Sequence, residues 1–447
     1  MRSCRRQVRY SRKEKSMAMK KKPVTGMKDI LPREMEIRDY AIGLIKETYK
    51  KFGFTSMETP CVEHIENLSS KQGGENEKLI FKILKRGEKL KLAEAQTEAD
   101  LVDGGLRYDL TVPLCRYYSN NANDLPSPFK ALQMGNVWRA DRPQRGRYRQ
   151  FMQCDIDILG EPTILAEIEL ILATTTLLGR LDFSKFTIRI NDRRILRAMV
   201  DYAGFTAPKK PEGEEQPTEV DYDGIFITLD KMDKIGLEGV REELIADGYE
   251  EATVDKYLDL FRQVTGDTAG LKLLRETLGD VLPEGIAEDL CTIMESVDGA
   301  KEADFRVAFD PTLVRGMSYY TGPIFEISMD EYGGSVGGGG RYDEMIGRFT
   351  GQSTPACGFS IGFERIVMLL LERDFKVPGT KGKTAFLVEK GMPREKLAAI
   401  LAKARELRKE GTEINVVMMK KNKKFQKDQL SGEGYTEITE FFADREV

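Results

Sequence analysis

The chain has 447 residues, of which 40% are hydrophobic and 32% are charged. This length predicts two or three domains with a full core, and no apolar run approaches the roughly 18 residues that a membrane helix needs. The net charge is −4, but residues 1–22 contribute +9, which leaves −13 for the rest. A polyanionic partner must therefore be met by local basic patches and not by a global field.

Cysteine and histidine usage limits the kinds of site that the chain can build. Its six cysteines (4, 61, 115, 154, 291 and 357) are scattered without a CxxC pair, and His64 is the single histidine. This pattern argues against both a zinc site and a disulfide framework, and it favours a reducing, cytoplasmic compartment. Residues 1–22 are Arg-rich and Lys-rich and are expected to be a disordered extension. An over-extended start site is favoured over a transit peptide.

The first half of the chain is predicted to combine helices with paired strands. Apolar residues at helical spacing from Arg33 to Phe52 predict an amphipathic helix. The alternating segment that follows is broken by Pro60, which suits a sheet edge or a bend. Segments 131–138 and 151–159 predict the two strands of a long hairpin, and residues 163–180 and 185–190 predict a helix and then a strand.

The connection of this hairpin holds five arginines within eleven residues: Arg139, Arg142, Arg145, Arg147 and Arg149. Guanidinium groups capture phosphate or carboxylate in a planar, bidentate way. So many of them would repel one another unless a polyanion neutralises them. A solvated basic loop is the alternative, but the interleaved Gln, Gly and Tyr residues argue against a plain basic tail.

The second half changes in composition. Residues 205–219 are rich in Pro and Glu and are expected to form a loop or hinge. From Val220 to about residue 300 the helical periodicity and heavy charge indicate an insertion, because strand patterns resume at Phe305. Residues 384–447 begin with a strand, a helix (394–409) and a second strand, the start of a small α/β domain. A final segment, 435–442, is a candidate for one more strand.

Two glycine-rich segments match neither common phosphate-binding loop. Residues 333–340 hold six glycines, which let a backbone approach a ligand closely ahead of a strand or helix. The GKT at 382–384 is not a Walker loop, because its first glycine would fall on Val377 and a strand follows it. In GFSIGFERI (358–366) the two glycines allow close packing and Arg365 would point back from the start of an apolar helix, with a buried strand–helix junction as the alternative. Phosphate recognition is therefore left to arginines.

Together these segments resemble class II aminoacyl-tRNA synthetases, and most closely the histidyl-tRNA synthetase family, from residue 26 to residue 366. Pro60 sits where the first family motif has a proline at the dimer interface. LRYDLTVPLCRYY (106–118) and WRADRPQRGRYRQFMQCDID (138–157) resemble the second motif with its loop, and GFSIGFERI resembles the third. LVRGMSYYTG (313–322) and GGGGRYD (337–343) are similar to two segments particular to the histidine enzymes.

The resemblance implies an α+β fold with a class II antiparallel sheet core over residues 23–375 and a helical insertion at about 195–300. Residues 383–447 would form an anticodon-binding-like α/β domain that is shortened relative to the family. The implied activity is a ligase that charges tRNA(His) with L-histidine through histidyl-adenylate. It would convert ATP to AMP and diphosphate with Mg²⁺, as a cytoplasmic homodimer without a membrane segment or a protein-built metal site.

Carried over residue by residue, the resemblance assigns the phosphate end of the site to four arginines. Arg139 would bind the α-phosphate and the histidine carboxylate, and Arg315 would lie opposite it to stabilise the transition state. Arg147 and Arg365 would hold the triphosphate, with Arg365 also stacking on adenine. Attack of a carboxylate on a phosphate joins two anions, so guanidinium groups aimed at the developing charge are the main catalytic device.

The resemblance assigns the amino acid end to acidic and aromatic residues. Asp109, Thr111 and Gln153 would read the α-amino group. Asp157 and Tyr320 would meet the imidazole, with Tyr319 and the Gly337–Gly340 backbone lining its pocket. No general base is needed, because the histidine carboxylate is already ionised at neutral pH.

Two departures from the family keep an alternative open. Ser318 stands where the family usually has Asp, and Met317 replaces Leu, which leaves the orientation of Arg315 undecided. The shortened C-terminal domain slightly favours a histidine-sensing regulatory subunit of ATP phosphoribosyltransferase, a synthetase paralogue without charging activity. The complete set of four arginines argues against a pure sensor, and a class II enzyme of another specificity is the third possibility.

Overall fold

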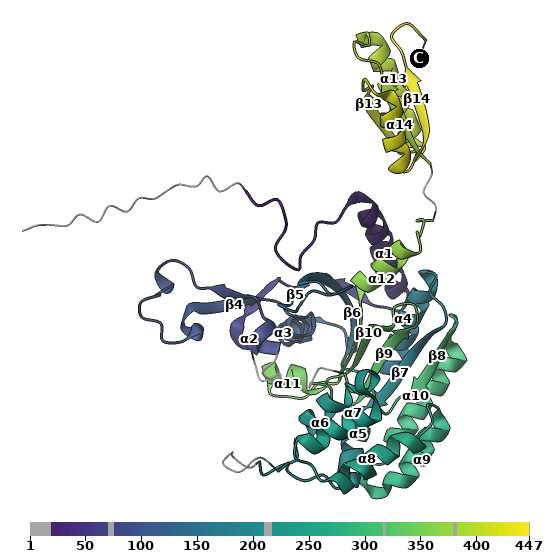
Figure 1. Ribbon diagram of the computed structural model, residues 1–447. Coiled ribbons are helices and arrows are strands. Elements are labelled where there is room, and N and C mark those ends of the chain that lie inside the picture. The colour runs from purple at the N-terminus through teal and green to yellow at the C-terminus, as the bar shows by residue number, and fades with distance from the viewer. Residues whose placement is uncertain (1–18, 70–75, 210–216, 316–318, 379–381, 447) are drawn as a thin grey trace, which may run out of the picture.

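The computed structural model describes residues 19–69, 76–209, 217–315, 319–378 and 382–446. Its centre is an eight-stranded sheet with the order β1-β5-β6-β11-β10-β9-β7-β8 (Figure 1). The five inner pairings are antiparallel, and only the two edge pairings, β1–β5 and β7–β8, are parallel. The predicted α+β class with a mainly antiparallel core is thus confirmed.

The strands of this sheet are β1 (Thr55–Met57), β5 (Phe129–Trp138), β6 (Gln150–Leu159), β7 (Phe186–Asp192), β8 (Phe305–Phe309), β9 (Pro323–Met329), β10 (Gly334–Arg341) and β11 (Ala356–Ile361). A small antiparallel sheet beside it has the order β2 (Val62–His64), β4 (Val102–Leu106) and β3 (Lys82–Leu84). The long hairpin predicted around the five arginines is the pair β5–β6.

One face of the large sheet is covered by α1 (Pro32–Lys51), α4 (Leu165–Arg180) and α12 (Phe363–Glu372). Side chains alternate along a strand, so β6 turns Cys154, Ile156 and Ile158 towards the buried core on this side. The residues between them, among them Gln153 and Asp157, face the opposite side. The short α2 (Ile65–Ser69) and the paired α3 (Thr111–Asn121) and α11 (Glu344–Thr350) complete this part of the fold.

The described segment between β7 and β8 is helical, in agreement with its periodicity. It comprises α5 (Arg193–Ala203), α6 (Tyr222–Leu229), α7 (Met232–Ala246), α8 (Glu251–Gln263), α9 (Thr268–Leu278) and α10 (Ile286–Ala300). These helices lie together, in teal, at the lower part of Figure 1. Because β7 and β8 are parallel neighbours, the helical segment is the connection that returns the chain to the same end of the sheet.

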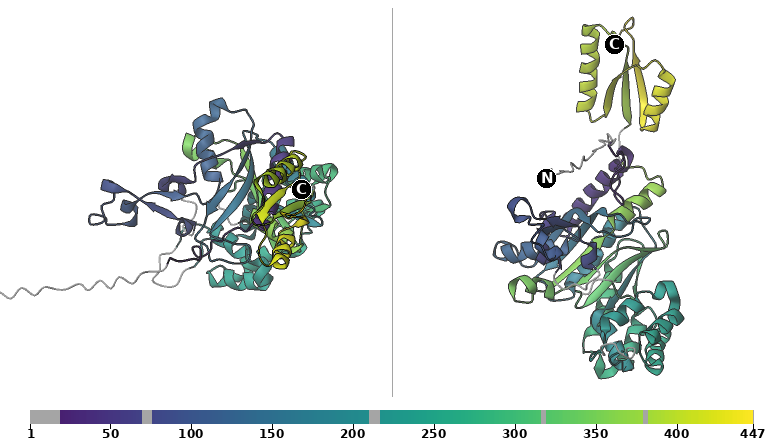
Figure 2. Two further views of the ribbon diagram at one scale, coloured as in Figure 1. Left: turned by 90° about the horizontal axis from the view of Figure 1, so that it is seen from above. Right: turned by 60° about the vertical axis from the view of Figure 1, so that its left-hand side comes forward.

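The C-terminal segment forms a second sheet, of three parallel strands, with the order β13 (Ile414–Met418), β12 (Lys383–Val388) and β14 (Tyr435–Phe441). Helices α13 (Arg394–Lys409) and α14 (Lys423–Gly432) flank it (Figure 2). Alternate residues of β12 face the two helices: Phe386 packs with Ile400, and Leu387 with Leu430. The last strand was anticipated, whereas α14, hidden in a lysine-rich stretch, was not.

Two other sequence interpretations need correction or fall outside the description. The six glycines at 333–340 largely form the central strand β10 itself and do not precede an element. Met317, Ser318 and most of the basic N-terminal stretch lie outside the described residues. Within the described ranges, no helix combines the length and apolar character needed to cross a membrane.

Candidate active site

A cavity of about 520 Å³ lies on the sheet face opposite α1 and α12, over strands β6, β10 and β11. That volume is typical of a site for small molecules. All ten residues singled out from the sequence line it: Asp109, Thr111, Arg139, Arg147, Gln153, Asp157, Arg315, Tyr319, Tyr320 and Arg365. The backbone of Gly337–Gly340 lines it as well. Segments separated by more than two hundred residues therefore converge on one site.

Arg139 is held at the mouth of the hairpin by its neighbours. Its Nε donates to the carbonyl oxygen of Tyr108 at 3.1 Å, and its guanidinium lies 4.2 Å from the centre of the Tyr108 ring and 5.3 Å from that of Phe151. Cation–π contacts fix a guanidinium without neutralising it. Arg139 therefore keeps its charge for an anionic ligand.

The arginines of the hairpin connection diverge, and only Arg139 and Arg147 of the five line the cavity. Arg145 forms a two-oxygen contact with Glu372 on α12, at 2.7 and 2.8 Å. Arg149 turns back and donates from Nε to the carbonyl oxygen of Asp141 at 3.1 Å. The five arginines are thus not one cluster, because the chain makes a tight turn between Gln144 and Arg147, whose backbones bond to each other, with Gly146 at a φ of 70°.

Arg365 enters from the first turn of α12. It donates from a terminal nitrogen to the carbonyl oxygen of Ser335 at 2.6 Å, and its guanidinium lies 5.3 Å from the centre of the Tyr332 ring. Burial lowers the pKa of Arg365, and the nearby Arg147 also lowers it. Two cations facing the same space make this part of the cavity a place for a polyanion.

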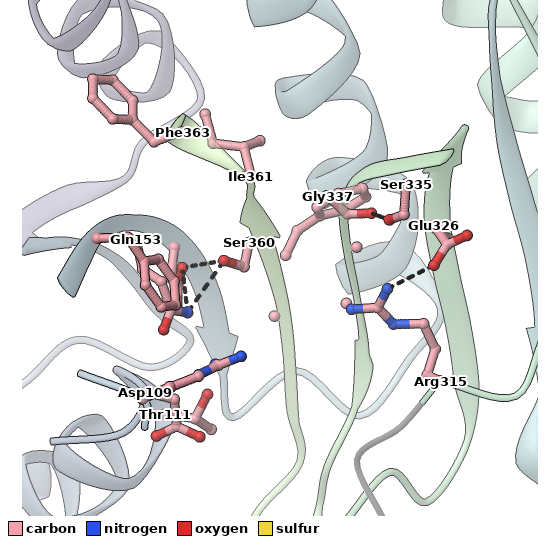
Figure 3. Close-up of a pocket in the computed structure, with 18 of the residues that line it drawn as sticks. Asp109, Thr111, Gln153, Arg315, Glu326, Ser335, Gly337, Ser360, Ile361 and Phe363 are labelled. Atoms are coloured by element: carbon pink, nitrogen blue, oxygen red, sulfur yellow. Dashed lines mark hydrogen bonds and ion pairs between the residues drawn. The ribbon is translucent and has the colours of Figure 1, made fainter. Parts of the chain in front are cut away.

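Arg315 lies deeper and has a left-handed backbone, with φ of 62°. Non-glycine residues adopt this region uncommonly, and strained backbone of this kind clusters at functional sites. One terminal nitrogen donates to Glu326 on β9 at 2.9 Å (Figure 3), whereas its buried Nε has no partner among the described residues. An unsatisfied buried donor is costly, so this N–H is suited to donate a hydrogen bond to a ligand oxygen.

The opposite end of the cavity is rich in acceptors. Asp109, just before α3, accepts through Oδ1 from the Val112 backbone N–H at 3.2 Å. Its Oδ2 and the Oε1 of Gln153 are both buried, and neither has a partner within the described part of the chain. Figure 3 shows Asp109, Thr111 and Gln153 on the side of the cavity away from Glu326. Two free acceptors on one wall fit a donor such as an ammonium group.

Asp155 determines how Gln153 is oriented. The Gln153 side-chain amide donates from Nε2 to Asp155 at 3.1 Å, and the Ser360 hydroxyl donates to Asp155 at 2.5 Å. With its NH₂ group committed to this carboxylate, Gln153 must turn Oε1 towards the cavity. Burial raises the pKa of Asp155 to about 7, opposed by the hydrogen bond from Ser360.

Asp157 forms the floor next to the tyrosines. The Tyr342 hydroxyl donates to its Oδ1 at 2.5 Å. Burial raises the pKa of Asp157 well above its usual range, the charge of Asp155 adds to this, and the hydrogen bond from Tyr342 opposes it. A Cβ on Gly358 would lie 2.0 Å from this oxygen, so only glycine leaves room for the carboxylate. Tyr319 and Tyr320 stand beside it with ring centres 4.8 Å apart.

Similarity to known proteins covers the part of the chain that builds this cavity. The family model described as histidyl-tRNA synthetase matches residues 26–366, which include every cavity residue named above. The chain belongs to the histidyl-tRNA synthetase family. A relative described as histidine–tRNA ligase, from Leifsonia xyli subsp. xyli, is 42% identical over 423 residues, spanning 92% of this chain and 93% of the relative.

Solved structures show the same fold at greater distance. A histidyl-tRNA synthetase from Nostoc sp. PCC 7120 is 27% identical with a TM-score of 0.72, covering 93% of this chain and 90% of that one. A protein from Bacillus halodurans, described as an ATP phosphoribosyltransferase regulatory subunit/histidyl-tRNA synthetase, has the same TM-score of 0.72 at 22% identity, with 95% and 98% coverage. That second likeness concerns the fold alone.

The cavity residues of this family member that were not assigned roles from the sequence include Asp155, Glu326, Tyr342 and Ser360. The alternation of Gln153, Asp155 and Asp157 on one face of β6 contains the signal for Asp155. Tyr342 was noticed beside the glycines, but its partner, Asp157, lies 185 residues away on β6. Arg341, next to it, forms a buried pair with Glu167 at 2.7 Å and is part of the core.

Proposed function

We propose that the chain charges tRNA(His) with L-histidine in two steps, first forming histidyl-adenylate and diphosphate from ATP and then transferring the histidyl group to tRNA with release of AMP. One observation carries the proposal: a single cavity has arginines at one end and, at the other, buried acceptors that have no partner among the residues the structure describes. The ligand that fits is a zwitterion whose carboxylate must meet a phosphate. A histidine bound by its amine at Asp109 would direct its carboxylate towards Arg139.

The four arginines are proposed to act on the first step. Arg147 and Arg365 hold the β- and γ-phosphates, with Arg365 also stacking on adenine. Arg139 and Arg315 approach the α-phosphate from two sides as the histidine carboxylate attacks. The reaction places extra negative charge on the α-phosphate oxygens in the transition state, and fixed guanidinium groups stabilise that charge more than they stabilise the ground state.

Histidine selection is proposed to rest on Asp157 and Tyr320. The carboxylate of Asp157 accepts from a ring N–H, while Tyr320 meets the other side of the imidazole and Tyr319 closes the pocket. Asp109, Thr111 and Gln153 hold the α-amino group. A site built to accept a ring N–H rejects analogues without one, because its buried acceptor is then left unpaired.

Mg²⁺ is proposed to enter with the nucleotide. No group of three or more His, Cys, Asp or Glu side chains in the described ranges forms a metal cage. Mg²⁺ commonly binds through substrate phosphates and waters with one or two carboxylates, so this lining is compatible with an ion carried by ATP. When bound, the ion would neutralise part of the phosphate charge that the arginines do not reach.

The domain roles and the assembly follow the same proposal. Residues 23–375 carry the chemistry, with a helical insertion at about 195–300, and residues 383–447 form an anticodon-binding domain. Two copies associate in the cytoplasm through the region of Pro60, where β1 is an edge strand of the large sheet. An edge strand has unpaired backbone groups that a second copy can cover. Sedimentation of the full chain tests the dimer.

Exchange of labelled pyrophosphate into ATP tests the first step. Purified chain, ATP and Mg²⁺ are incubated with each of the twenty amino acids in turn, and exchange is expected with histidine alone. Transfer to tRNA(His) is measured separately as acid-precipitable histidine. Arg373 forms an ion pair with Glu331 outside the cavity, so Arg373→Ala serves as a control for removal of one arginine.

The alternative functions give different results. Histidine binding without any exchange identifies the chain as a sensor, as expected for a regulatory subunit. Exchange with another amino acid overturns the assigned specificity but leaves the enzyme class intact. Exchange with histidine but no transfer to tRNA would show that the second step is missing.

A further inference from the structure

Glu326 on β9 is a cavity carboxylate whose function lies outside the roles proposed above. Arg315 donates to its Oε2 at 2.9 Å, and the two side chains are only 21% and 16% exposed (Figure 3). In so little water an ion pair holds its partners more firmly than on an open surface. Glu326 therefore sets where the Arg315 guanidinium lies before any ligand arrives.

The second oxygen of Glu326 faces another arginine. Arg189 on β7 is the direct cross-strand neighbour of Glu326, and its terminal nitrogen lies 3.4 Å from Oε1. Arg189 is itself held by Asp310, which accepts from its Nε at 2.5 Å. One carboxylate is thus shared between two guanidinium groups, and only one of these groups lines the cavity.

The opposite side of Arg315 is closed by backbone. Gly338 on β10 is the neighbour of Glu326 across the sheet. A Cβ on Gly338 would lie 2.7 Å from a terminal nitrogen of Arg315. The guanidinium is therefore confined between a glycine and a carboxylate of adjacent strands, which gives it a defined place.

The helical segment between β7 and β8 reaches the same group of charges. Asp233 in α7 accepts from Arg189 at 3.1 Å, and Asp230, just before α7, lines the cavity. Burial raises the pKa of Asp230, and the charge of Glu326 adds to this rise. Asp233 is mostly exposed, so its ion pair contributes little. Asp230 is the closer link between the helices and the cavity.

We propose that Glu326 and Arg189 are positioning residues for Arg315. Through the charge of Asp230, the helical segment between β7 and β8 also interacts with Glu326 and Arg315. This inference rests on the proposed function. Glu326 alone would compete with the α-phosphate for Arg315, because both are anions. Arg189 interacts with the second oxygen of the Glu326 carboxylate and so weakens the attraction of Glu326 for Arg315. Arg315 is then held in position but can still bind the α-phosphate. Neither Glu326 nor Arg189 is assigned a contact with the reacting atoms.

Pyrophosphate exchange by the full chain tests the proposal, with kcat and both KM values measured. Glu326→Gln keeps the side-chain shape and removes the charge, and it is expected to lower kcat about 10- to 100-fold, the cost of a misplaced catalytic group. The KM for histidine should change less than twofold. Arg189→Met should also lower kcat, and Arg189→Lys should restore part of it. Asp230→Asn should lower the KM for ATP.

The matched control is Glu169→Gln. Glu169 pairs with Lys130 at 2.7 Å, with side chains 29% and 26% exposed, and it does not line the cavity. If Glu326→Gln matches Glu169→Gln in kcat while the wild type catalyses exchange, the positioning role is overturned. If a thermal melt shows that Glu326→Gln does not fold, the comparison of Arg189→Lys with Arg189→Met tests the positioning role instead. Equal kcat values for these two variants would overturn that role. A wild type without exchange would instead refute the proposed function.

Discussion

Tyr342→Phe removes one hydroxyl from the floor of the candidate site and leaves the ring in place. That hydroxyl donates to Asp157 at 2.5 Å, and both side chains are buried. A hydrogen bond to a charged group contributes about 1.5–3 kcal/mol. Without it, burial drives the pKa of Asp157 still higher, and a protonated Asp157 loses acceptor strength for a ring N–H. At 1.4 kcal/mol per factor of ten, histidine affinity should fall about 10- to 150-fold.

Calorimetric titration with histidine measures this loss, and pyrophosphate exchange gives the two KM values. The KM for ATP should change little, because the arginines lie at the other end of the cavity. Tyr257→Phe is the control: its hydroxyl is also buried but has no partner among the described residues. Unchanged histidine affinity in Tyr342→Phe, or an equal loss for ATP, would refute the assignment of Asp157 to the imidazole.

Three further results are expected. Arg315→Ala should lower the exchange rate about 10²–10³-fold, as for loss of one transition-state donor, with a smaller effect on histidine affinity; equal losses would indicate ground-state binding. Histidine affinity should rise as pH passes through the Asp155 pKa of about 7, because the ionised carboxylate orients Gln153. Asp155→Asn should lack this rise. Subtracting its pH profile of histidine affinity from that of the wild type removes the contribution of the ligand's own imidazole, which titrates in both. Binding of tRNA should weaken with salt by a log–log slope of about −0.7 to −0.9 per neutralised phosphate; salt-independent binding would contradict recognition through basic patches.

The anticodon question concerns the C-terminal segment, whose described residues, 382–446, form a three-stranded unit. Their sheet places β12 between β13 and β14. If this domain reads the anticodon poorly, anticodon substitutions should cost less than about 1.5 kcal/mol in charging, below a good base contact, and acceptor-end changes should cost more. A large anticodon penalty in a charging assay on tRNA variants would show the reverse.

Local order in this chain follows from its own periodicity. The apolar spacing of residues 33–52 predicted α1, and the two alternating segments around the arginines predicted the hairpin β5–β6. These elements depend on contacts between residues close in sequence, so pattern alone indicates them. Family motifs further singled out ten residues, and all of them line one cavity. Helix α14 was not predicted, because its many lysines leave only a weak apolar periodicity and its start depends on capping by Asn422.

Partnerships across strands were decided only by the tertiary structure. The pairing of Tyr342 with Asp157 joins residues 185 positions apart, and the sharing of Glu326 between Arg189 and Arg315 depends on the register of β7 against β9. A shift of one residue would turn the strand side chains among them, Asp157, Arg189 and Glu326, to the other face of the sheet. The sequence therefore determined which charged groups the site contains. Strand register decided which of them are paired in the core and which are left free for a ligand.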